Sequence, residues 1–347
     1  MARRIEPARR SVALAASALL VWAALSPAAA AQNPGDYEHL IDLYAAGDIQ
    51  NAVAVLGGWT TRSVTAAARG PLLLPDRQRA AVMLHTDVAA ALTNIDNVRA
   101  FFHLEFARAL VGRIPFRRDQ DSQALEFVRH WYEFAPTVYL LANDVYRARG
   151  CMSEGLTRLP APHSMLHFYQ GVTFEIEGTR PGTPLTPRGF NRHGGRSGAL
   201  EAAADAYRRS LTEDEHLAAA RLHLGWVHFG QHDARARQEL EAALADAGPD
   251  IATRYLAHLF LGALAERDQR LADALHEFEE ACAVGPQYQT AYIALARVAE
   301  ELGDVDHARE AAAAMIDLQK GEDPWWNYLG GFNMDALAWL RAAARAR

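Results

Sequence analysis

Apolar residues recur at intervals of three and four along most of the chain, the spacing that places them on one face of an α-helix. Phe101, Leu104, Ala107 and Leu110 form one such series. The pattern predicts an all-α protein. In the first half it predicts helices over residues 37–46 and 48–56 around Gly47, and over 77–92, 97–114, 122–134 and 137–149 with a break at Pro136, while 60–76 is an extended connection.

A second, longer period marks residues 251–318, where small and aromatic residues recur at a spacing of 34. The pair Leu261-Gly262 returns as Leu295-Ala296, and Pro286 closes the first copy. Small residues at such positions let two antiparallel helices approach closely, and an aromatic side chain fills the space that they leave. The other matched positions are Ala265 and Ala299, Ala274 and Ala308, Phe278 and Ala312, and Ala281 and Met315.

These residues at this spacing resemble the tetratricopeptide repeat (TPR), whose first helix carries a Leu-Gly pair and whose second carries small, aromatic and small residues before a Pro. Gly225 and Gly171 hold the Leu-Gly position in two less regular upstream units, so the resemblance covers residues 163–318. It implies an α-solenoid with a right-handed superhelical twist, because one helix pair cannot bury its apolar face alone. Residues 36–160 are then divergent helical hairpins or a separate helical cap.

An insertion over residues 177–198 interrupts the first of these units inside its hairpin. It is rich in Gly and Pro and carries Arg180, Arg188, Arg192 and Arg196 against one Glu. Long loops in compact repeats are usually functional or disordered. Two interpretations stay open: a basic loop that contacts a partner, or a solvated insertion.

The last residues, 319–347, bring Trp325, Trp326 and Tyr328 together before a predicted helix over 333–344. Each aromatic ring can bury about 150 Å² or more and is costly to leave in water. A solenoid also needs a cap at its open end. We therefore expect these rings to cover the last repeat, and the alternative is a ligand site for them, such as a glycan-binding platform.

The N-terminus resembles a secretory signal over residues 1–31: four Arg, an apolar core of about 15 residues, then small residues up to Ala31. The core is short for a membrane span, although an uncleaved anchor is the alternative. The formal charge of the whole chain is −7, and removing a +3 signal leaves −10. We expect a periplasmic or secreted protein, and the acidic charge argues against nucleic acid as a general partner.

Residues that carry chemistry are few. The two cysteines, Cys151 and Cys282, lie far apart in a solenoid, so we expect two buried thiols and no disulfide. No phosphate loop, serine elbow or metal-protease motif is present. His163 and His167, like His228 and His232, are four apart, but no acidic residue at helical spacing completes either pair, so we predict no metal site and no cofactor.

The resemblance also implies a binding surface, because the first helices of TPR units line a concave face. An aromatic residue beside arginines on that face is typical of peptide anchoring. The prediction is a non-catalytic scaffold for a peptide or envelope protein; the alternatives are a metal-dependent hydrolase using the histidines and the Arg-rich insertion, and a glycan-binding module. The residues carried onto the concave face are Phe168, Val172, Leu222, Trp226, Leu259, Ala263, Glu266, Arg267, Ile293, Arg297 and Glu300.

Overall fold

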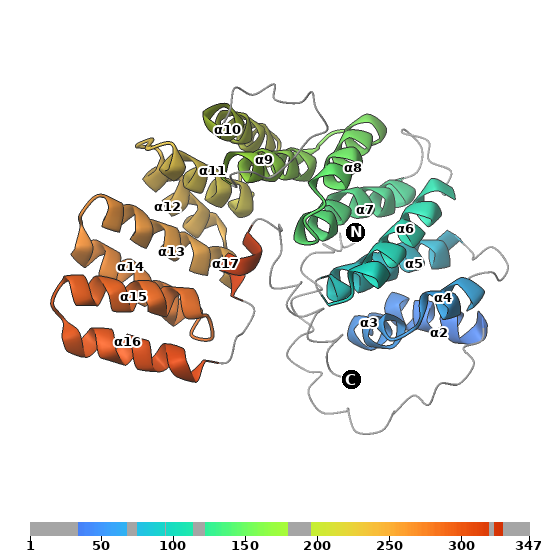
Figure 1. Ribbon diagram of the computed structural model, residues 1–347. Coiled ribbons are helices and arrows are strands. Elements are labelled where there is room, and N and C mark those ends of the chain that lie inside the picture. Colours follow the sequence, from blue (N-terminus) through green and yellow to red (C-terminus); the bar gives the residue numbers. More distant parts are fainter. Residues whose placement is uncertain are drawn as a thin grey trace, which may run out of the picture.

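The computed structural model describes residues 34–67, 75–93, 95–113, 122–179, 196–318 and 323–328 of the chain. Within these ranges every regular element is a helix, which confirms the all-α prediction. The helices form a curved array of antiparallel pairs (Figure 1). In order they are α2 (Pro34–Ala45), α3 (Ile49–Gly57), α4 (Thr61–Ala67), α5 (Pro75–Leu92), α6 (Asn97–Arg113), α7 (Ser122–Leu141), α8 (Val145–Arg158), α9 (Ser164–Thr179), α10 (Arg196–Glu213), α11 (Ala218–Gly230), α12 (Ala236–Asp246), α13 (Ile251–Arg267), α14 (Leu271–Val284), α15 (Gln289–Glu301), α16 (Val305–Asp317) and α17 (Pro324–Asn327).

The C-terminal half reproduces the predicted repeat frame in the pairs α9/α10, α11/α12, α13/α14 and α15/α16. In the first three pairs, the glycine of the Leu-Gly position faces a large side chain of the second helix. A Cβ atom on any of these glycines would lie closer than 3.0 Å to that side chain, so only glycine allows the helices to pack at this distance. The contacts are Gly171 with Tyr207, Gly225 with Leu240, and Gly262 with Phe278. The TPR-like solenoid is therefore confirmed.

The first helices of the pairs line the inside of the curve. Helix α11 contacts both α9 and α13, so these three inner helices form a continuous layer. The short helix α17 lies against α13 on the same inner side (Figure 1). The chain therefore returns to the inner face after its last repeat.

Two predictions for the N-terminal half are wrong. Within the predicted extended connection over 60–76, residues 61–67 instead form α4, whose start is capped by Thr60 Oγ1 accepting from the backbone N of Ser63 at 3.1 Å, while residues 68–74 lie outside the described residues. Pro136 does not end a helix either: α7 continues through it to Leu141. Burial of the surrounding side chains outweighs the local cost of proline. The chain turns instead at Asn143, with φ at 61°, before α8 begins.

The two cysteines behave as predicted. Cys151 of α8 and Cys282 of α14 are buried free thiols, and they belong to two different hydrophobic cores. Burial raises the pKa of Cys282 to about 12, and burial raises that of Cys151 as well. Both thiols therefore pack as small apolar side chains.

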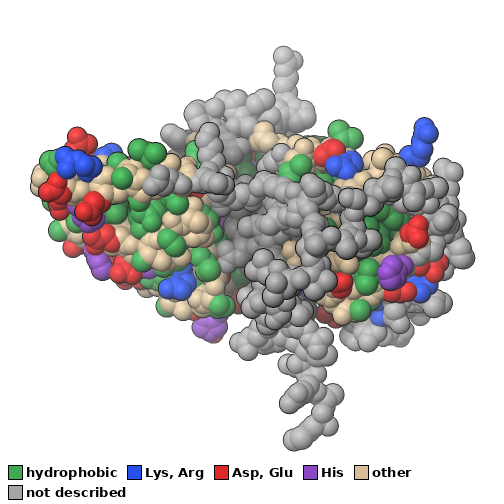
Figure 2. Space-filling model, turned by 90° about the horizontal axis from the view of Figure 1, so that it is seen from below, with side chains coloured by type: hydrophobic (Ala, Val, Ile, Leu, Met, Phe, Trp, Pro, Cys, Tyr) green, Lys and Arg blue, Asp and Glu red, His purple; other side chains and the backbone are tan. Residues whose placement is uncertain are grey.

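None of the described helices is both long and apolar enough to cross a membrane. On the face seen in Figure 2, hydrophobic, acidic and basic side chains are interspersed over the described C-terminal repeats at the left. Several large apolar side chains of α15 and α16 stay exposed, among them Ile293 at 51%, Val305 at 58% and Ile316 at 75%. The predicted signal over 1–31 and the predicted helix over 333–344 lie outside the described residues.

Candidate functional site

The C-terminal segment, residues 323–328, is bound to the inner helix face through the carboxylate of Asp323. Its Oδ2 accepts hydrogen bonds from Tyr255 Oη at 3.1 Å and from the backbone N of Thr290 at 2.8 Å. The Tyr255 oxygen in turn accepts from the backbone N of Ala291 at 3.1 Å. Asp323 is only 1% exposed, and it lies at the N-terminus of α15, where free backbone N–H groups and the helix dipole favour a negative charge.

The aromatic rings of this segment pack onto the inner helices. Trp325 meets the rings of Trp226 in α11 and Phe260 in α13 edge-on, each at a centroid distance of 5.8 Å. Tyr328 stacks on His223 of α11 at 4.2 Å with the planes 11° apart. These contacts correct the prediction that the rings cap the last repeat: they cover α11 and α13, while Trp326 is 72% exposed.

Beneath Tyr328 lies a buried polar cluster that joins three helices. Glu175 of α9 is fully buried, and its Oε2 accepts from Tyr207 Oη of α10 at 2.6 Å and faces His223 Nδ1 at 2.9 Å. Burial, followed by the charge of Glu175, raises the pKa of Tyr207 and of Tyr328 well above the ordinary value. Both phenols therefore stay protonated and serve as donors or packing groups, not as bases.

Four of the eleven predicted concave-face residues are buried in the cores. They cannot present their side chains to a partner, because these side chains are enclosed in the two hydrophobic cores. Phe168, for example, packs against the rings of Tyr207 and His223. The four are Phe168, Val172, Leu222 and Leu259, at 5% exposure or less.

The remaining seven reach the surface and fall into two groups. Trp226, Ala263, Glu266 and Arg267 are half-buried, whereas Ile293, Arg297 and Glu300 are exposed. Two arginines already have partners within the chain. Arg297 Nη2 lies 2.7 Å from Glu266 Oε2, which links α15 to α13. Arg267 donates to the carbonyl of Phe229 at 2.9 Å and lies over its ring, which fixes α13 to α11.

The predicted loop contacts at Arg180, Arg188 and Arg192 lie outside the described residues, as does the side chain of Arg196, the first residue of α10.

The histidine pairs behave differently from each other. His228 is buried, burial lowers its pKa, and His232 is exposed, so these two do not form a pair of ligands. His163 and His167 do approach each other, and the end of α10 adds Glu213 to them. Analysis of spacing along one helix missed this carboxylate because it comes from the second helix of the hairpin.

Sequence reasoning also missed the residues that hold the C-terminal segment. Asp323-Pro324 followed by two Trp is a helix-start signal, since Asp is a common N-cap and Pro a common first residue. Asp323 Oδ1 accepts from the backbone N of Trp325 at 2.9 Å, as that signal predicts. Nothing in the spacing, however, indicates that its second oxygen contacts Tyr255 and α15.

Comparisons with known proteins give structural similarity only. No protein family and no curated protein matches the chain at the sequence level. A structure of PilF from Pseudomonas aeruginosa is 17% identical with a TM-score of 0.47, covering 62% of this chain and 82% of that one. A MamA structure is 14% identical with a TM-score of 0.37, covering 55% and 95%. A human IFIT1 dimer with PPP-AAAA is 14% identical with a TM-score of 0.47, covering 83% and 65%.

Proposed function

We propose that this chain is an exported, non-catalytic interaction scaffold that binds a peptide segment of another envelope protein on the inner face of α11, α13 and α15. One observation carries the proposal: this face already holds a short acidic and aromatic segment, residues 323–328, with groups from all three helices. A surface that orders one such segment has the donors and rings needed for another.

The chemistry of the bound segment indicates what the partner presents. The N-terminus of α15 and the Tyr255 hydroxyl accommodate a carboxylate. The indole ring of Trp325, two residues after Asp323, packs against Trp226 and Phe260. The phenol ring of Tyr328 stacks on His223. The proposed partner therefore carries an Asp or Glu followed by aromatic residues at the spacing of Asp323, Trp325 and Tyr328.

A partner of this kind competes with the chain's own segment. An intramolecular ligand on a short tether has an effective concentration on the order of millimolar, so the partner needs a tighter fit or further contacts. Ile293, exposed on α15 one turn beyond Thr290, offers such a contact.

A peptide-binding experiment tests the proposal. The double variant Asp323→Ala and Trp325→Ala is expected to release residues 323–328 from the inner face. A labelled peptide with the sequence of residues 323–328 should then bind the variant, measured by fluorescence anisotropy, and should bind the wild type at least tenfold more weakly. Trp326→Ala, at the exposed neighbouring ring, is the matched control and should behave as the wild type. Equal, negligible binding to all three proteins contradicts the proposal.

Export is proposed from the basic, apolar and small-residue order of residues 1–31. Mass spectrometry of the protein isolated from cell envelopes should find a mature N-terminus near Gln32. Full-length chain retained in the cytosol contradicts this part alone.

The glycan alternative has less support, because its three aromatic residues do not share an open surface. Tyr328 is 4% exposed, Trp325 is half-buried, and only Trp326 is open. In the structure, the rings of Trp325 and Tyr328 pack against other residues of the same chain.

A further inference from the structure

Two histidines and a carboxylate meet where the hairpin of α9 and α10 begins and ends. His163 precedes α9, His167 lies in its first turn, and Glu213 is the last residue of α10. One possible ligand atom from each lies within 4.8 Å of the others. The imidazoles are half-buried and the carboxylate is exposed, so the cluster is open to an ion from solvent.

The hydrogen bonds around the two rings leave one nitrogen of each available to a metal. His163 Nε2 lies 3.0 Å from the carbonyl oxygen of Leu159, and His167 Nδ1 lies 3.0 Å from Gln170 Oε1. These oxygens only accept, so the facing ring nitrogens carry the protons of the neutral imidazoles. The lone pairs are therefore on His163 Nδ1 and His167 Nε2, as in metal sites where a second oxygen partner orients each histidine.

The backbone around the cluster is fixed from three sides. Arg129 of α7 donates to the carbonyl of Pro160 at 2.7 Å and also to that of Pro162, which holds the loop in front of His163. Ser210 Oγ donates to the carbonyl of Ser164 at 2.8 Å and ties the end of α10 to the start of α9. The backbone N of His163 donates to the Glu213 carboxylate itself.

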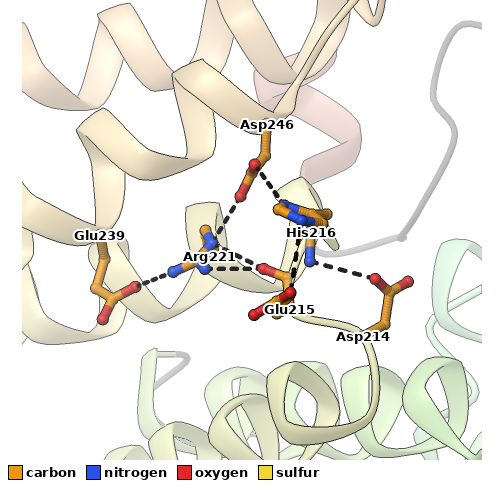
Figure 3. Close-up of polar contacts among 6 residues, drawn as sticks. All are labelled: Asp214, Glu215, His216, Arg221, Glu239 and Asp246. Carbon is orange, nitrogen blue, oxygen red and sulfur yellow. Dashed lines mark hydrogen bonds and ion pairs between the residues drawn. The ribbon is translucent and has the colours of Figure 1, made fainter.

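The loop after Glu213 is held by a separate polar network (Figure 3). His216 Nδ1 lies 3.0 Å from Asp246 Oδ1, and Arg221 Nε donates to Asp246 Oδ2 at 2.8 Å. Arg221 also donates to the carbonyl of Glu215 at 2.8 Å. These bonds fix the chain that follows α10, so Glu213 stays at the hairpin end.

We propose that His163, His167 and Glu213 bind one Zn²⁺ ion, an inference independent of the peptide-binding function. Two imidazole nitrogens and one carboxylate oxygen are a ligand set that Zn²⁺ accepts with bonds of about 2.0–2.2 Å, leaving a position for water. Tetrahedral geometry places such ligands ~3.4 Å apart, so the cluster has to contract by little more than 1 Å. Glu213 is exposed at a helix end, so small changes of its side-chain torsions can make that movement while its carboxylate keeps the bond from the backbone N of His163.

The site has a structural consequence for the hairpin. Helices α9 and α10 are joined through residues 180–195 at one end, and the metal ligands lie at the other. An ion there connects the start of α9 to the end of α10 directly. Because it binds the folded hairpin and not the unfolded chain, zinc is expected to raise the stability of the protein.

Zinc binding to the full, untagged chain tests the proposal. After treatment with a chelator, calorimetric titration with Zn²⁺ should give one ion per chain and thermal unfolding should shift upward. Second-shell substitutions already cost about 10–100-fold in metal affinity, so losing a direct ligand in His167→Gln should cost ~100-fold or more. Glu213→Gln, an isosteric change at an exposed position, should weaken binding without affecting the metal-free unfolding temperature.

Two matched controls make the result specific. His276→Gln changes an exposed histidine of α14, and Glu215→Gln changes an exposed carboxylate two residues beyond Glu213. Both should bind zinc like the wild type. Absence of stoichiometric zinc in the wild type overturns the proposal, and so does zinc binding that survives in both His167→Gln and Glu213→Gln. Loss of zinc in the controls as well would show that binding does not depend specifically on His163, His167 and Glu213, and would also overturn it.

Discussion

The two halves of the solenoid differ in how regularly their helix pairs use close glycine contacts. In the C-terminal repeats, glycines at the Leu-Gly position let paired helices approach until Phe278 or Tyr207 touches the opposite backbone. In the N-terminal half, large rings and buried polar side chains fill the space between helices. Tyr37 Oη lies 2.9 Å from His85 Nε2, and His85 Nδ1 lies 2.8 Å from His103 Nδ1, with both histidines fully buried.

Because of this difference, the repeat period can be recognised in the sequence of the C-terminal half but not in that of the N-terminal half. A close helix approach needs a small residue at a fixed spacing, and that spacing is visible as a period. A buried histidine pair needs only two residues that meet in space, and it leaves no period. The N-terminal half therefore diverges from the repeat frame while keeping the same helix-pair architecture.

The largest expected effect on the free energy of unfolding comes from disrupting the close contact between Gly262 and Phe278. Gly262→Leu places atoms where Phe278 lies, and overpacking of this kind costs about 1–3 kcal/mol in the free energy of unfolding. Gly230→Leu is the matched control, because a Cβ there meets only Leu200 at 3.9 Å. Urea unfolding followed by circular dichroism measures both. Equal losses would mean that the glycine contact does not set the packing of the repeats.

The histidine cluster of the N-terminal half should respond to acid. Burial, with a smaller contribution from Arg99, lowers the pKa of His103 to about 3, against about 6.5 in the unfolded chain. Below pH 6.5 the unfolded chain therefore binds a proton that the folded chain does not. The free energy of unfolding falls as the pH falls from 6.5 towards 3, by about 2 kcal/mol between pH 6.5 and 5 for this group.

His103→Asn should remove that share of the acid dependence. Unfolding free energies of the wild type and the variant are compared at pH 6.5 and pH 5. Burial also raises the pKa of Asp87 to about 7, so this carboxyl group increases the free energy of unfolding as the pH falls. Both proteins contain Asp87, so its contribution cancels in the comparison. His276→Asn, at an exposed position of α14, is the control. Parallel curves for the wild type and His103→Asn would show that this histidine does not drive the acid sensitivity.

A smaller effect is expected where the C-terminal segment meets the repeats. Tyr255→Phe removes the hydroxyl that donates to Asp323 and accepts from the backbone N of Ala291. Leaving such buried groups without a partner costs about 1–2 kcal/mol. Tyr292→Phe on α15, at a half-buried ring, is the control. If both variants unfold at the same temperature, the contacts of the segment do not contribute to the stability of the repeats.

Much of the fold was predictable because it follows from local rules. Gly47, with φ at 95°, turns the first hairpin as predicted, and the frame of Gly171, Gly225 and Gly262 held in three pairs. Pro136 misled the prediction because packing around α7 overrides a local preference. The binding surface was predictable only in part. The repeat register shows which residues lie on an inner helix, but it does not show which of them reach the surface. Trp226 does so, whereas Phe168 is buried.

The return of residues 323–328 changes how the repeats depend on one another. In an ordinary solenoid each repeat contacts only its neighbours, so stability is a sum of local contributions and an end can fray alone. Here one short segment contacts α11, α13 and α15 together, through His223, Tyr255 and Thr290. These contacts are long-range in sequence, so the three repeats are joined into a single cooperative unit that is completed only after the chain beyond the last repeat has folded back.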